Sequence, residues 1–156
     1  IAGFLRRDPV LNRYVKTWQL WGGTPKDGDA PAPETCPQLR ITPASTGVAR
    51  RFDNTTTYEP FDLVVEMSVA GPSPIALARF WAQVRRVLFP ADPTAAATFN
   101  AAMIAAGVSE LNIKSAPTGL AYSPNPNGPA QVDWPMAHGV ARIGVDVYVQ
   151  TQPTPS

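Results

Sequence analysis

The segment 61–90 constrains the fold most, because a strand pattern runs directly into a helix pattern there. Apolar and mostly polar side chains alternate along 62–69, and a period of two is typical of a strand with one buried face. The apolar set is Leu63, Val65, Met67 and Val69, and the other set is Asp62, Val64, Glu66 and Ser68. The sequence therefore predicts a strand that packs one face against a core.

A helix is predicted immediately after this strand. Ser73 can cap its first turn, because the hydroxyl accepts a backbone N–H, and Pro74 fits the first helical position, where no N–H is needed. Apolar side chains then recur at three- and four-residue steps, at Leu77, Phe80, Trp81, Val84, Val87 and Leu88. Pro90 ends the pattern. We expect the fold to be organised around this strand and helix.

The rest of the chain carries weaker patterns of the same two kinds. A first helix is predicted after Asp8-Pro9, with an apolar stripe at Leu11, Tyr14, Val15, Trp18 and Trp21. An alanine-rich helix follows Asp92, with Phe99 and Met103 as its only large apolar contacts. Short strands are predicted at 38–42, 110–115 and 140–149. The predicted fold is an α+β domain, with an antiparallel or mixed sheet of about four strands and helices packed on one face.

Two long proline-rich loops, 22–37 and 116–135, interrupt this pattern. The chain is predicted to be one domain, 1–156, with its core at about 8–21, 38–116 and 138–150 and a polar tail at 150–156. Loops of this length are uncommon in a compact domain unless they are functional or disordered. Stiff loops lose less entropy on docking, so we expect them to contact a partner; exposed loops without a partner remain the alternative.

The composition of the chain limits the classes of function that it can have. The formal charge is +1, from 13 basic and 12 acidic residues, which argues against a dedicated nucleic-acid binder. The single cysteine, Cys36, cannot form a disulfide framework within the chain. No apolar run reaches the roughly 18 residues of a membrane span. The chain starts at Ile1 without a methionine, so we expect residues to be missing before it.

Candidate catalytic chemistry is sparse. His138 is the only histidine, and a hydrogen-bonded or exposed loop position explains it more simply than catalysis. Cys36 has no Cys or His at zinc-ligand spacing, so a small buried or edge residue is expected, and no phosphate-binding glycine motif is present. Asp62 and Glu66 are expected to form an exposed carboxylate row. We therefore expect no enzyme, no metal site and no cofactor.

The order of elements nevertheless resembles a known family. The stretches that carry this resemblance are the strand at 58–69, the helix at 75–89 and the strand at 140–149. They are similar to the tail terminator and tail-completion proteins of tailed bacteriophages and to the neck proteins of gene transfer agents. Another neck component, such as a stopper or adaptor, fits nearly as well.

The resemblance implies a structural virion protein, assembled in the host cytoplasm, that forms a ring homo-oligomer, expected to be a hexamer. Such a ring caps the tail tube protein and joins it to the head–tail connector or stopper, and genomic DNA passes through its lumen without sequence-specific binding; no membrane is involved. Expected subunit or partner contacts are Pro25, Pro31, Pro33, Arg50, Arg51, Pro124, Pro126 and Trp134. Expected lumen-facing residues are Asp62, Glu66 and Asp146.

Two interpretations from other classes stay open. A small carbohydrate- or ligand-binding module could use a pocket lined by Trp134 and Tyr122. A hydrolase with a cryptic site would have to depend on His138. Neither interpretation has a motif behind it.

Overall fold

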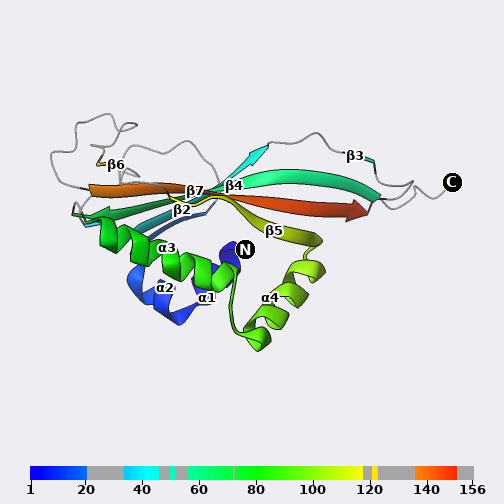
Figure 1. The fold of residues 1–156 in the computed structure, drawn as a ribbon, viewed down its shortest axis with the longest axis horizontal. Coiled ribbons are helices and arrows are strands. Elements are labelled where there is room, and N and C mark those ends of the chain that lie inside the picture. The colour runs from blue at the N-terminus through cyan, green and yellow to red at the C-terminus, as the bar shows by residue number, and fades with distance from the viewer. Residues whose placement is uncertain are drawn as a thin grey trace.

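The computed structural model describes residues 1–20, 34–45, 50–51, 56–71, 73–117, 121–122 and 136–150. These residues form four helices and one mixed sheet of seven strands (Figure 1). The described helices all lie on the same face of the sheet, and none of them lies on the other face. This confirms the predicted α+β fold with helices on one side, although the sheet has more strands than the four expected.

Two long antiparallel strands form the centre of the sheet. The strands are β1 (Thr17–Leu20), β2 (Gln38–Ser45), β3 (Arg50–Arg51), β4 (Thr56–Ala70), β5 (Val108–Ser115), β6 (Ala121–Tyr122) and β7 (Met136–Gln150). β4 and β7 pair along their whole length, and the main order across the sheet is β1-β2-β4-β7-β5. Among the pairs of strands in the described residues, β1–β2 is parallel and the others are antiparallel. The two-residue strands β3 and β6 pair with β4 and β7.

Three of the four helices begin with the cap and proline that the sequence predicts. The helices are α1 (Ala2–Arg7), α2 (Pro9–Tyr14), α3 (Pro74–Leu88) and α4 (Pro93–Ala105). Asp8, Ser73 and Asp92 precede α2, α3 and α4, and each side chain accepts a backbone N–H of the first turn. The shortest of these bonds joins the Ala95 N–H to Asp92 Oδ2 at 2.8 Å.

The predicted first helix is wrong in its second half. It ends at Tyr14, and Trp18 lies in strand β1, while Trp21 lies outside the described residues. The physical reason is long-range: β1 pairs with β2 across the segment between them, and this ladder replaces the hydrogen bonds of a continued helix. The separate helix α1 before Asp8 was not predicted.

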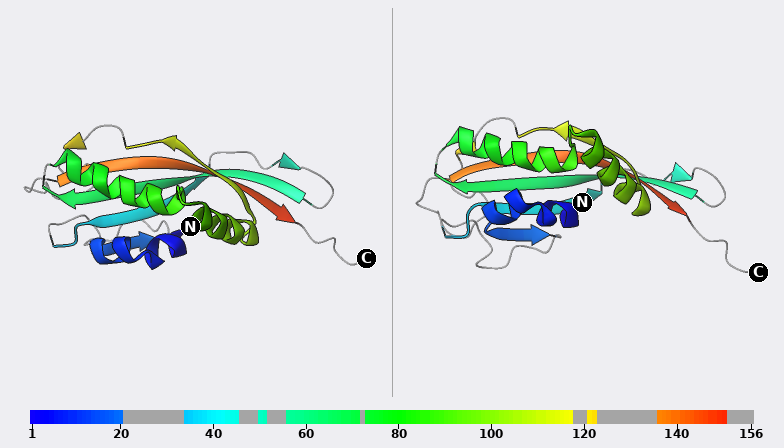
Figure 2. Two further views of the ribbon diagram at one scale, coloured as in Figure 1. Left: turned by 60° about the horizontal axis from the view of Figure 1, so that its bottom comes forward. Right: turned by 90° about the horizontal axis from the view of Figure 1, so that it is seen from below.

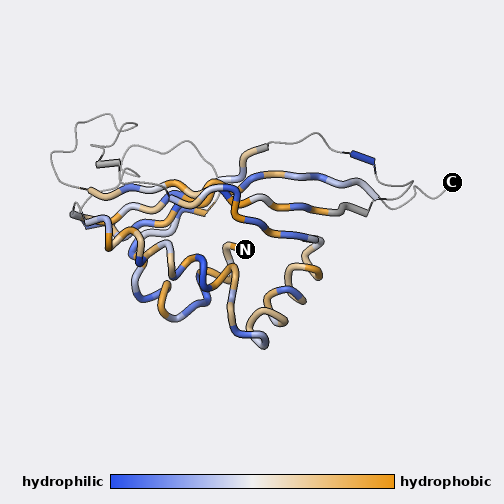
Figure 3. Tube along the Cα trace, in the orientation of Figure 1, coloured by the Kyte–Doolittle hydropathy of each residue, from blue (hydrophilic) through white to orange (hydrophobic). Residues whose placement is uncertain are grey.

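The core lies between the helices and the central strands. Its buried residues include the predicted strand set Leu63, Val65, Met67 and Val69 and the predicted α3 residues Leu77, Phe80, Trp81, Val84 and Leu88. Leu5, Leu11, Phe99 and Met103 add the buried side of the other helices. Figure 3 shows the resulting run of apolar residues along the sheet and the facing helices. A Cβ added to Gly139 of β7 would lie 2.8 Å from Leu77 Cδ2, so this glycine lets α3 pack closely on the sheet.

The two central strands continue beyond the helix-covered core. β2 follows β4 only as far as Phe61, and β5 follows β7 only as far as Val147. Beyond Phe61, β4 residues 56–60 pair with β7 residues 146–150, of which Asp146 and Val147 also pair with β5, and β3 adds a short third strand. We call this ribbon the arm; Figures 1 and 2 show it extending away from the helices.

Candidate interaction surfaces

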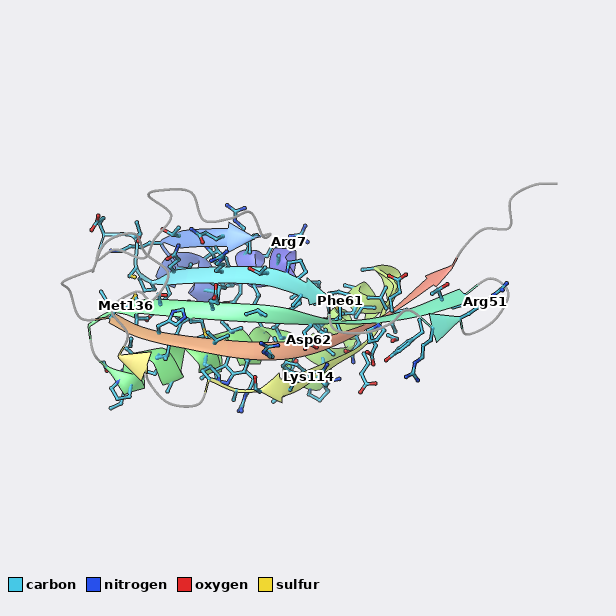
Figure 4. The ribbon with its side chains drawn as sticks, turned by 90° about the horizontal axis from the view of Figure 1, so that it is seen from above. Arg7, Arg51, Phe61, Asp62, Lys114 and Met136 are labelled. Carbon is cyan, nitrogen blue, oxygen red and sulfur yellow. The ribbon has the colours of Figure 1, made fainter. Side chains whose placement is uncertain are left out.

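The open face of the sheet, opposite the helices, carries an ion pair between a buried aspartate and an exposed lysine. Asp62 of β4 is only 4 % exposed, and Lys114 Nζ lies 2.6 Å from its Oδ1. Lys114 belongs to β5, so its side chain crosses β7 to reach Asp62 (Figure 4). It passes over Gly144, where an added Cβ would lie 2.8 Å from Lys114 Cε and 2.5 Å from Asn112 Oδ1. The absence of a side chain at Gly144 therefore leaves room for Lys114 to cross β7 at this position.

The prediction of an exposed row of carboxylates is wrong for Asp62. This side chain is buried, and its carboxylate is paired with Lys114. The strand register does place Asp62, Glu66 and Asp146 on the same face of the β4–β7 pair. Glu66 is half-buried and lies 3.5 Å from Arg40 Nε. Asp146 is half-buried, and its backbone carbonyl accepts a hydrogen bond from Ser109 Oγ at 3.0 Å. The open face is thus a charge-balanced surface and not an acidic one.

His138 belongs to the same open face, where it is held by Ser68 of the neighbouring strand. Ser68 Oγ and His138 Nδ1 share a hydrogen bond of 3.0 Å. Burial lowers the pKa of His138, and the negative charge of Glu66 opposes that shift only in part. Ser68 is 4 % exposed, so its hydroxyl is not presented to a substrate. His138 is hydrogen-bonded, as predicted, but it lies within strand β7 and not in a loop, and the contact is most simply a cross-strand link.

Cys36 is the small buried residue that the sequence predicts. It is 2 % exposed, and burial raises the pKa of its thiol to about 11. A thiol with so high a pKa is a weak nucleophile at neutral pH. Within the described residues, no three His, Cys, Asp or Glu side chains lie together as a metal site would require.

The arm exposes the two arginines that were predicted to contact a partner. Arg50 and Arg51 form β3 and pair with Tyr58 and Thr57 of β4, with both arginine side chains exposed. A small apolar cavity of about 180 Å³ lies at the base of the arm, and Phe61 contributes to its lining. The other expected contacts lie outside the described residues: Pro25, Pro31, Pro33, Pro124, Pro126 and Trp134. The structure therefore brings only the arginine pair to a described surface.

An apolar surface on α4 and β5 was missed by the sequence reasoning. A groove of about 500 Å³ runs between α4 and β5 and is lined by Phe89, Phe99, Met103 and Leu111 among others. Ile104 on the exposed side of α4 is 71 % exposed. The available signal was composition, since the 13 residues of α4 include no charged side chain. Figure 3 draws most of this helix in the apolar colours. A helix without charges is typical of one that is covered on more than one side.

Comparison with known proteins adds no identification. The chain matches no protein-family model and no curated protein. Among the described residues, no helix has the length and apolar character needed to cross a membrane.

Proposed function

We propose that this chain is a structural protein of the phage neck or tail, a ring-forming tail terminator that caps the tail tube and joins it to the head connector. The observation that supports this proposal best is the arm. A ribbon of two strands is at most marginally stable in water by itself. The arm therefore gains most from a surface outside its own subunit, which a neighbouring copy would supply.

In the proposed ring, the arm of one copy lies on the α4–β5 surface of the next. The two surfaces are different parts of the same chain, and such head-to-tail contacts close into a ring when the rotation between copies fits. The α4–β5 surface suits this role because the exposed Ile104 lines a groove that carries both apolar and polar side chains. Burying Ile104 and the groove would remove apolar area from water, which favours association.

The open sheet face is the proposed lumen surface. Its acidic residues Glu66 and Asp146 are accompanied by Arg40 and Arg142, whose positions share that face in the register. Asp62 is buried and would not contribute a free carboxylate. Phosphate affinity rises with each basic residue engaged, so a balanced face would let DNA pass without tight binding.

The oligomeric state tests this proposal. Size-exclusion chromatography with light scattering, repeated over a concentration series, is expected to give one closed oligomer larger than a dimer. The variant Arg50→Glu/Arg51→Glu is expected to shift the mass towards the monomer, whereas the control Arg6→Glu/Arg7→Glu on α1 is not. A monomer at tens of micromolar, both alone and with tail tubes, would overturn the proposal.

The groove also favours a second candidate function, binding of a small apolar ligand. Its volume of about 500 Å³ falls in the range of small-molecule sites. A nonpolar fluorescent dye would then bind with one-to-one saturation, and Ala96→Trp, which fills the groove, would abolish that binding. Ala95→Trp is the matched control, because Ala95 does not line the groove.

A further inference from the structure

The charges of this chain are segregated, although its total charge is only +1. The four helices contain six arginines and no lysine, aspartate or glutamate. These arginines are Arg6 and Arg7 on α1, Arg13 on α2, and Arg79, Arg85 and Arg86 on α3, and all six are exposed. The near-neutral balance of the sequence conceals this separation.

The arginines lie on one helical layer, because α1, α2 and α3 pack against one another (Figure 2). Arg86 Nη2 contacts Asp8 Oδ2 at 2.7 Å and so joins α3 to the start of α2. Tyr14 and Phe80 meet edge to face with their ring centres 5.1 Å apart. Only Arg86 has an acidic partner among the described residues, whereas Arg6, Arg7, Arg13, Arg79 and Arg85 have none there.

Exposed apolar side chains belong to the same layer. Val10 and Tyr14 on α2 are 47 % and 39 % exposed, and Ile75 at the start of α3 is 63 % exposed. We call the six arginines together with these three residues the basic helix surface. Arginine, aromatic and apolar residues are enriched at protein interfaces, and lysine is depleted there.

We propose that the basic helix surface docks onto an acidic protein surface with an apolar centre, supplied by a protein other than this chain. Arginine binds carboxylates in a two-pronged geometry and would match such a partner. A nucleic-acid backbone would also attract arginine, but it gives Val10 and Ile75 no apolar contact. A second copy fits poorly, because the exposed acidic residues of the described part occur singly on separate elements: Glu34, Glu59, Asp92 and Glu110.

Three labelled probes distinguish the possible partners by fluorescence anisotropy. They are a glutamate–leucine peptide, a glutamate–serine peptide of equal charge, and a DNA duplex. The glutamate–leucine peptide is expected to bind about fivefold or more tightly than either other probe, because only it supplies both carboxylates and apolar contacts. Its affinity should fall when sodium chloride rises from about 50 to about 300 mM, since salt screens the charges.

Variants on the basic helix surface, each paired with a control variant elsewhere, test whether the peptides bind to that surface. Arg79→Glu/Arg85→Glu should weaken both peptides about tenfold or more, whereas Arg50→Glu/Arg51→Glu on the arm should change them less than about twofold. Ile75→Ser should weaken only the glutamate–leucine peptide, and Ile113→Ser on β5 is its control. Circular dichroism verifies that each variant is folded.

Four outcomes would overturn the proposal: tightest binding to the duplex, no saturable binding to either peptide, equal effects of the helix and arm variants, or loss of self-association in Arg79→Glu/Arg85→Glu. The peptide test is separate from that of the proposed ring, which is the mass in solution of the protein and its arm variant without any probe.

Discussion

The central strands β4 and β7 lie in two different environments along their length. In the body, Val65 is fully buried between β2 and β7 and beneath the helices. In the arm, Thr57 is half-buried, and its neighbours are only β7 and the two-residue strand β3. The alternation of side chains continues through both parts, but the layer of helices does not. The body is thus stabilised from within the subunit, and the arm is the part that stands to gain from another subunit.

A proline substitution should have its most different effects on stability in the body and in the arm of β4. Val65→Pro removes a ladder hydrogen bond in the body and should destabilise the fold by about 3 kcal/mol or more. Thr57→Pro should leave the body folded and lower the free energy of unfolding by less than about 1 kcal/mol, since local opening of an edge is inexpensive. Urea denaturation followed by tryptophan fluorescence measures both. Equal losses would show that the arm is part of the same cooperative core.

The helix layer can be tested at Phe80, which is 1 % exposed and belongs to α3, the helix that packs on β4 and β7. Phe80→Ala should lower the free energy of unfolding by about 3–5 kcal/mol, because it leaves a cavity in the core. Ile75→Ala on the exposed side of α3 is the control and should change it by less than about 0.5 kcal/mol. A small loss for Phe80→Ala would mean that the helices contribute little to the body.

On the open face, Gly144 can be tested as the residue that leaves room for the ion pair between Lys114 and Asp62. Gly144→Ala should displace the ends of the Lys114 and Asn112 side chains and cost up to about 1 kcal/mol by loosening the ion pair. Gly3 on α1 has no atom within 4 Å of an added Cβ, so Gly3→Ala should be neutral or stabilising by up to about 1 kcal/mol. Thermal melts of both variants measure the difference. A neutral Gly144→Ala would contradict the crossing of Lys114 over β7.

The smallest expected effect concerns pH. Burial lowers the pKa of His138 in the folded protein, so the unfolded chain binds its proton more readily. Stability from this group is complete above the ordinary histidine pKa of about 6.5 and is lost as the pH falls through the lower folded value. His138→Gln should therefore reduce the loss of stability between about pH 7 and pH 5, measured by urea denaturation at each pH. An unchanged pH profile would contradict the lowered pKa of the half-buried His138.

The sequence predicted those parts of the fold that are determined by residues close to one another in the chain. The strand set around Val65, the stripe of α3 and the caps at Ser73 and Asp92 all follow from residues close in sequence. Strand β1 could not be predicted this way, because its partner strand begins 18 residues after it ends. The spacing of Tyr14, Val15 and Trp18 fits a helix as well as a helix followed by a strand.

The candidate surfaces were less predictable for the same reason. Asp62 looks exposed in its own strand pattern, and it is buried because Lys114 reaches it from β5. The basic helix surface was hidden by a total charge near zero and emerges only when charges are counted per element. Arg50 and Arg51 were predicted to contact a partner, and the structure places them on the arm, which keeps that prediction open to test.

Site-specific cross-linking tests the central claim most directly, namely that the arm of one copy lies on α4 of the next. The variants are Glu59→Cys on the arm and Ile104→Cys on α4, joined by a short bifunctional maleimide. The native Cys36 should not react, because it is buried and its thiol has a pKa of about 11. A mixture of Glu59→Cys with Ile75→Cys is the control, since Ile75 lies on a different surface.

The account predicts that the mixture of Glu59→Cys and Ile104→Cys gives abundant cross-linked dimers, and that the double variant gives a ladder of products that ends at one closed ring. Cross-linking no stronger than in the Ile75→Cys control, or a double variant that yields only monomers, would contradict it.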